Sequence, residues 1–121
     1  MARAAAAAEN AALNGLDGTG ATNVIGYVSL HTGDPGTTGA TENAATGGYA
    51  RQACSWNAAA GGAKTNSSSL SFSTAGSVAV TYFGTYNVAS AGNYALGGAL
   101  ASGVTAATIT IAAGAISVSI T

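Results

Sequence analysis

The side chains that could carry out chemistry are few, and most of them lie between His31 and Cys54. His31 and Asp34 stand three residues apart across a turn, where each could orient the other. A serine hydrolase would need a nucleophile beside His31, but the sequence has no G-x-S-x-G motif. A Cys54–His31 dyad would require the strands that carry the two residues to be neighbours. We therefore predict that the chain is not an enzyme, and we expect His31 to hydrogen-bond the backbone of residues 32–36.

Metal-binding residues are equally sparse. The chain has one histidine, one cysteine and four carboxylates, and no two of them have the spacing of a zinc site. Asp34 and Glu42, together with loop carbonyl groups, could hold a calcium ion weakly, because calcium takes oxygen ligands. Solvated carboxylates are the better interpretation, so we predict neither a metal nor a cofactor.

Arg51 is an isolated cation at the end of a long polar loop. It could pair with Asp34 or Glu42 and so pin the loop, or reach an acidic group on a neighbouring chain; we favour the first. Within the loop, Pro35 fixes one backbone angle and Gly36 can adopt a positive φ, which predicts a turn. The residues that we predict to organise the loop are His31, Asp34, Pro35, Gly36, Glu42 and Arg51.

Several aromatic side chains could form a contact surface. Tyr82, Phe83, Tyr86 and Tyr94 could stack on carbohydrate, but their spacing on predicted strands favours packing in the core or at an interface. The residues that we predict as a possible interface are Tyr27, Trp56, Tyr82, Tyr86 and Tyr94.

The charge distribution limits the partners that the chain could bind. Only 6% of its 121 residues are charged, against about 25% in a typical protein, and the net charge is −1. We therefore expect no nucleic-acid or membrane-surface binding, and no stretch reaches the roughly 20 apolar residues of a membrane span. From Thr65 to Thr121 there is no charged residue and no histidine. Either a Ser/Thr surface keeps this half soluble, or, as we favour, neighbouring subunits cover it.

The elements that position these residues are predicted to be almost entirely strands. Ala2–Leu16 is predicted to be an alanine-rich helix, with residues 1–22 forming a helix or arm plus a linker. Residues 23–121 are predicted to form an antiparallel β-sandwich or small jelly roll of about seven to eight strands. Residues 58–66 are expected to be a turn region, and the last two strands to pair with each other around Ala113-Gly114. The predicted strands are 24–31, 49–56, 68–73, 78–86, 93–101, 104–112 and 115–121.

Four short motifs carry a family resemblance. They are Ser29-Leu30-His31-Thr32, Asp34-Pro35-Gly36, Gly39-Ala40-Thr41-Glu42 and Gly48-Tyr49-Ala50-Arg51. With this pattern the chain resembles small tailed-phage virion structural proteins, a group described as tail-fibre-like, minor capsid or decoration proteins. The resemblance implies an all-β virion component that is made in the bacterial cytoplasm.

From this resemblance and the uncharged β-surface we predict a non-enzymatic capsid decoration or cement protein. Its partners would be itself, with a trimer as our expectation, and other virion proteins, above all the major capsid protein. The alternative hypothesis is a tail or tail-fibre subunit that contacts the host receptor.

Overall fold

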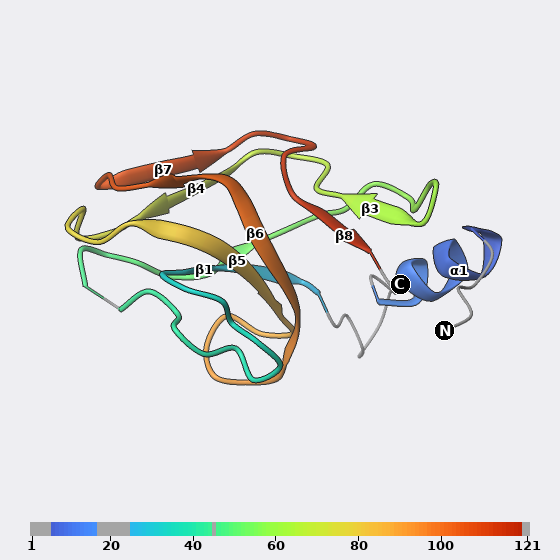
Figure 1. The fold of residues 1–121 in the computed structure, drawn as a ribbon, viewed down its shortest axis with the longest axis horizontal. Coiled ribbons are helices and arrows are strands. Elements are labelled where there is room, and N and C mark those ends of the chain that lie inside the picture. Colours follow the sequence, from blue (N-terminus) through green and yellow to red (C-terminus); the bar gives the residue numbers. More distant parts are fainter. Residues whose placement is uncertain (1–5, 17–24, 45, 120–121) are drawn as a thin grey trace.

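The computed structural model describes residues 6–16, 25–44 and 46–119 (Figure 1). This part of the chain contains one helix and eight strands, and all the strand pairs are antiparallel. The predicted all-β antiparallel fold is therefore confirmed. The elements are α1 (Ala6–Leu16), β1 (Tyr27–His31), β2 (Gln52–Ala53), β3 (Ala63–Thr65), β4 (Leu70–Ser73), β5 (Val80–Tyr86), β6 (Tyr94–Val104), β7 (Thr108–Ile111) and β8 (Ser117–Ser119).

The strands form one larger sheet and two small ones. The four-stranded sheet has the order β2-β1-β5-β6, while β3 pairs with β8 and β4 pairs with β7. In Figure 1 the β4–β7 pair lies above the four-stranded sheet, so the two form layers. Leu30 of β1 stands opposite Phe83 of β5, and Phe72 of β4 stands opposite Ile109 of β7. These buried side chains belong to the core between the layers.

Alternating sequence explains the layer formed by β4 and β7. In β4, Leu70 and Phe72 are buried while the serines between and after them are exposed. In β7, Ile109 and Ile111 are buried while the threonines are exposed. A period of two places every second side chain on the same face of a strand. Burying each large side chain contributes about 1.5–3 kcal/mol, so this pattern holds the layer against the core.

Two predictions about the chain's path are wrong. Residues 63–65 form β3 although they lie in the predicted turn region, and the last two strands do not pair with each other. The fully buried side chain of Asn66 explains the second difference, because it donates to the carbonyl oxygen of Ala112 and accepts from the amide of Ile116. These bonds hold the segment between β7 and β8 against Asn66. As a result, β7 pairs with β4 and β8 pairs with β3.

Helix α1 packs against the β domain through its last turn. Leu13 has no exposed surface and is part of the core. The side-chain oxygen of Asn14 accepts hydrogen bonds from the Ala59 amide and from Nζ of Lys64, each at 2.9 Å. Lys64 is itself buried and also donates to the Asn57 carbonyl oxygen. The described part of the predicted helix is confirmed, and its residues 2–5 lie outside the described residues.

Candidate functional site

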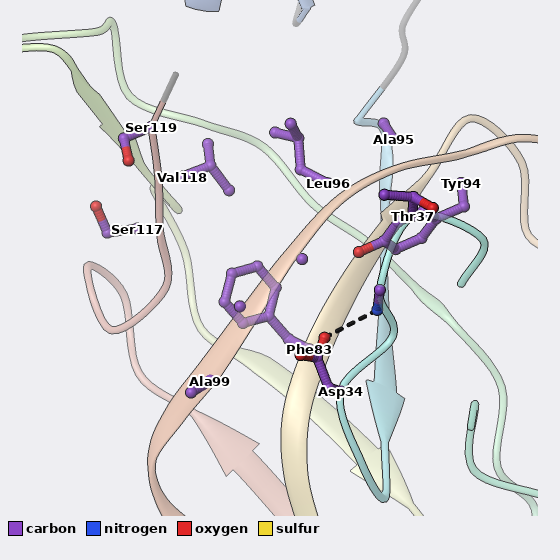
Figure 2. A pocket seen from close by; sticks show the side chains of 13 residues that line it. Asp34, Thr37, Phe83, Tyr94, Ala95, Leu96, Ala99, Ser117, Val118 and Ser119 are labelled. Atoms are coloured by element: carbon purple, nitrogen blue, oxygen red, sulfur yellow. Dashed lines mark hydrogen bonds between the residues drawn. The ribbon is translucent and has the colours of Figure 1, made fainter. Parts of the chain in front are cut away.

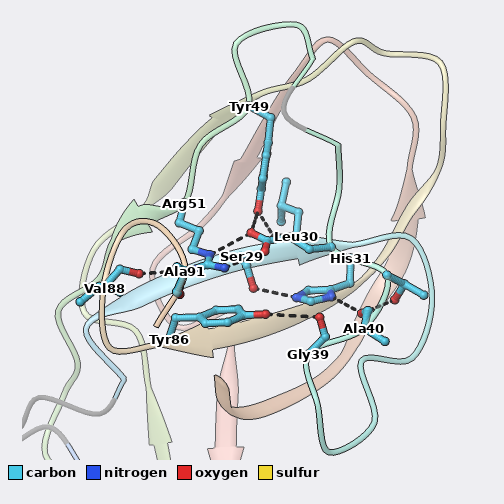
Figure 3. A network of polar contacts seen from close by, with 12 residues as sticks. Ser29, Leu30, His31, Gly39, Ala40, Tyr49, Arg51, Tyr86, Val88 and Ala91 are labelled. Atoms are coloured by element: carbon cyan, nitrogen blue, oxygen red, sulfur yellow. Dashed lines mark hydrogen bonds and ion pairs between the residues drawn. The ribbon is translucent and has the colours of Figure 1, made fainter. Parts of the chain in front are cut away.

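After β1 comes a long loop, of which residues 32–44 and 46–51 are described, and its residues Gly39 and Ala40 lie against the face of the four-stranded sheet that points away from the core. Figure 3 shows His31 and Tyr86 beside Ala40 and Gly39 of this loop, with Ser29 next to His31. One face of the sheet thus packs against the core, and the loop covers part of the other face. The predicted loop-organising residues meet in this region.

His31 is fully buried and links the strand to the loop. Its Nδ1 lies 2.7 Å from the Ala40 carbonyl oxygen, and its Nε2 lies 2.7 Å from the Ser29 hydroxyl. A carbonyl oxygen can only accept, so Nδ1 carries the proton and donates to Ala40. Burial lowers the pKa of His31, which keeps the ring neutral and lets Nε2 accept from Ser29. His31 therefore binds loop backbone farther along the chain than the predicted residues 32–36.

Glu42, Tyr49 and Arg51 form the polar centre of the loop. Arg51 donates from Nε to Glu42 Oε2 at 2.9 Å and from its terminal nitrogen to Oε1 at 2.8 Å, in a bidentate pair. The Tyr49 hydroxyl donates to Glu42 Oε2 at 2.8 Å and accepts from the Leu30 amide at 3.0 Å. Burial opposes ionisation of Glu42, yet the hydrogen bonds from Arg51 and Tyr49 hold its pKa below the usual value. Of the two carboxylates that we considered for Arg51, the structure places Glu42 against it.

Arg51 also ties the loop to the turn between β5 and β6. Its second terminal nitrogen donates to the carbonyl oxygens of Val88 at 3.2 Å and Ala91 at 2.7 Å. The guanidinium carbon lies 3.4 Å from the centre of the Tyr86 ring, which is cation–π geometry. The Tyr86 hydroxyl in turn donates to the Gly39 carbonyl oxygen at 3.3 Å. One arginine therefore joins two loops at the same end of the sheet (Figure 3).

The turn at residues 34–36 closes the other end of the loop. The Gly36 amide donates to Asp34 Oδ1 at 2.8 Å, and Gly36 has a φ of 61°. Pro35 is buried, and its carbonyl oxygen accepts from the amides of Gly39 and Ala40. Gly39 has a φ of 76°, and a Cβ at this position would overlap the Tyr86 hydroxyl. The close approach of this loop to the sheet therefore requires glycine at residue 39.

The predicted interface residues occupy different environments. Trp56 and Tyr86 are buried within the chain, and Trp56 Nε1 donates to the Ile25 carbonyl oxygen at 2.8 Å. Tyr27, Tyr82 and Tyr94 are half-buried. Trp56 and Tyr86 therefore pack inside the subunit and offer little surface to another chain.

The catalytic dyad that we considered does not form. The Cys54 amide binds the Gly26 carbonyl oxygen, and His31 lies five residues farther along, which is about 16 Å in an extended strand. The two side chains are therefore not neighbours. The described residues contain no group of three histidine, cysteine or acidic side chains that could hold a metal ion. Tyr49 was not predicted to organise the loop, although it donates to Glu42 and accepts from Leu30. The sequence offered one signal for this role, the position of the tyrosine two residues before Arg51.

No helix within residues 6–16, 25–44 or 46–119 has the length and apolar character needed to cross a membrane.

Comparison with known proteins identifies the family to which the chain belongs. No curated protein matches the sequence. The family described as "Podophage GP4 fiber I protein gp80" matches residues 3–119, which is almost the whole chain. The chain therefore belongs to this podophage fibre protein family and is a structural protein of a bacteriophage virion.

Proposed function

We propose that the chain is a subunit of a tail fibre and that its role is structural rather than catalytic. The observation that supports this most directly is the family match over residues 3–119, because the family's printed description is that of a fibre protein. Our second hypothesis from the sequence thus fits better than capsid decoration. Membership of the same family supports association of the chain with other virion proteins. We further propose that the fibre subunit contacts the host surface.

The charge arrangement supports a packing role. Arg51 is held by Glu42 within the chain, and buried Lys64 is held by Asn14 and by the Asn57 carbonyl oxygen. The exposed positions of the outer strands are instead serine and threonine. These residues are Ser71, Ser73, Thr108, Thr110, Ser117 and Ser119. Such a neutral surface can approach a neighbouring subunit without the desolvation cost of burying charges.

We propose that the subunit contacts the host through the surface where the loop after β1 and the turn between β5 and β6 meet. Residues 46–51 and the turn after β5 meet through Arg51. A pocket of about 390 Å³ lies here between Asn43, Ala50 and residues 89–91. Because hydrogen bonds fix both loops, this surface is already formed before a partner arrives, and preorganisation favours binding.

The position of the protein in the virion tests the proposal. Purified virions would be labelled with an antibody against the chain, conjugated to gold, and viewed by electron microscopy. A fibre subunit predicts label on the tail appendages and none on tailless heads. Label spread over the heads, and retained on heads that lack tails, would support capsid decoration and overturn the fibre assignment. Binding of the isolated protein to host cells, compared with non-host cells, then tests host contact separately.

A further inference from the structure

A groove of about 470 Å³ runs beside the N-terminal half of β6. Six consecutive residues of this strand, 94–99, line it. Successive side chains of a strand point to opposite faces of its sheet, so a cavity that touches all six lies along the strand's edge. Figure 2 shows the walls: Ser117, Val118 and Ser119 lie on one side of β6, and Asp34 and Thr37 on the other.

Both strands that border the groove have an open edge within the part of the chain that the structure describes. β6 pairs only with β5, and β8 pairs only with β3. β6 has 11 residues and contains no charged residue and no proline, which are the features that usually protect an edge strand from pairing with other chains. The open edge of β6 can therefore form hydrogen bonds with an added strand.

The groove's chemistry selects the kind of strand that it could accept. Its lining along β6 includes Ala95, Gly97, Gly98 and Ala99, and the wall from β8 carries two serine hydroxyls. Asp34 is the one charged residue among its lining residues. A charged or bulky segment would lose hydration or overlap these small residues. The matching occupant is extended, neutral and rich in small side chains, and β6 itself has this composition in YALGGALASGV.

We propose that this groove is a self-association surface, in which β6 of a second copy of the chain pairs with β6 along its open edge. Such an addition of a strand to a sheet edge is a known mode of protein recognition, in which the backbone supplies the hydrogen bonds. A two-fold axis would let each copy cover the other's open edge at once, so the assembly closes. The contact would extend the four-stranded sheet into a continuous sheet across the two subunits.

A lysine in the groove tests this surface. Ala99 is exposed and lines the groove, so Ala99→Lys leaves the core intact and places a charge where the second strand would lie. Ala58→Lys makes the same substitution at an exposed position outside the groove and outside the serine and threonine surface of the outer strands, and is the matched control. Sedimentation equilibrium over a range of concentrations would give the association constant of each protein. We expect the wild type and Ala58→Lys to dimerise alike, and Ala99→Lys to associate about tenfold more weakly or worse.

Hydrogen exchange locates the contact independently of the variants. Comparison of concentrated and dilute wild-type protein should show slower exchange of β6 amides in the concentrated sample and unchanged exchange in β7. A wild type that stays monomeric, or an Ala99→Lys variant that associates as the wild type does, would overturn the proposal. So would protection that changes on dilution only outside β6. These results do not depend on where the protein sits in the virion, so the fibre assignment stands or falls separately.

Discussion

Replacing Glu42 by glutamine tests whether the loop cluster stabilises the fold. Glu42→Gln keeps the size of the side chain and removes its charge. Arg51, whose side chain is only 8% exposed, then keeps its own charge without the carboxylate that binds it at two points. The amide oxygen can take the place of Oε2, which Tyr49 and Arg51 Nε share, but the amide nitrogen then faces the terminal nitrogen of Arg51 that Oε1 had bound, and both are donors. We therefore expect Glu42→Gln to lower the free energy of unfolding substantially.

The size of the loss follows from the hydrogen bonds that Glu42 accepts. Arg51 makes two of them and Tyr49 makes the third. A hydrogen bond to a charged group contributes about 1.5–3 kcal/mol net, and the amide of glutamine keeps one of the two oxygens. Glu42 is 24% exposed, so water compensates in part. We therefore expect the free energy of unfolding to fall by about 2–4 kcal/mol, below the upper range for a fully buried pair.

Chemical denaturation at several pH values measures this loss. The pKa of Glu42 in the folded protein lies below its ordinary value of 4.5, so the folded state binds this proton less readily than the unfolded state. The stabilisation is thus fully present above pH 4.5 and is lost as the pH falls through the folded pKa. The difference between wild type and Glu42→Gln should shrink over that acidic range.

Asp34→Asn provides the matched control. It is also a carboxyl-to-amide change in the same loop, but Asp34 accepts one hydrogen bond, from the Gly36 amide, and asparagine retains an oxygen for it. We expect a change within about 0.5 kcal/mol. The reasoning is refuted if Glu42→Gln unfolds at the same denaturant concentration as Asp34→Asn at neutral pH. It is also refuted if the difference from wild type stays constant as the solution is acidified.

Three further perturbations test other parts of the structure. The folded pKa of His31 lies below 6.5, so the wild type should lose stability as the pH falls below 6.5, and His31→Asn should lack this slope in denaturation curves. Gly84→Ala would place a Cβ 2.6 Å from His31 Nε2, and we expect it to lower the free energy of unfolding by about 1–3 kcal/mol in the same assay. Leu13→Ala should cost about 2–5 kcal/mol and speed limited proteolysis of α1, because Leu13 anchors the helix in the core. Unchanged proteolysis of α1 would show that the helix does not depend on this anchor.

Local patterns in the sequence were sufficient to predict several elements of the fold. The alternation of Leu70 and Phe72 with serine predicts β4, because a strand repeats every two residues whatever its partner. The alanine-rich segment similarly predicts α1 from propensity alone. The turn at Pro35 and Gly36 follows from the backbone angles that these residue types favour. The scarcity of charge pointed to a protein that packs against other protein, and the phage resemblance agrees with the family that matches.

Strand pairing could not be predicted in the same way. The sequence shows two strands around Ala113-Gly114, and a hairpin is the simplest connection between them. Asn66 is remote in the sequence, yet its side chain binds both Ala112 and Ile116 and directs the strands to different partners. The three residues of β3 are too few to show an alternation of apolar and polar side chains, so the sequence does not reveal this strand. It forms because β8 pairs with it.

The candidate site shows the same division. The sequence by itself placed His31, Glu42 and Arg51 near one loop and favoured Asp34 or Glu42 as the partner of Arg51 over an acidic group on a neighbouring chain. Only the tertiary structure decided between them, because the choice depends on how the loop folds over the sheet. It also brought β6 and β8 to the same groove, although 12 residues separate the end of one strand from the start of the other. Residue type and spacing fix local conformation, whereas contacts between distant segments depend on the packing of the whole chain.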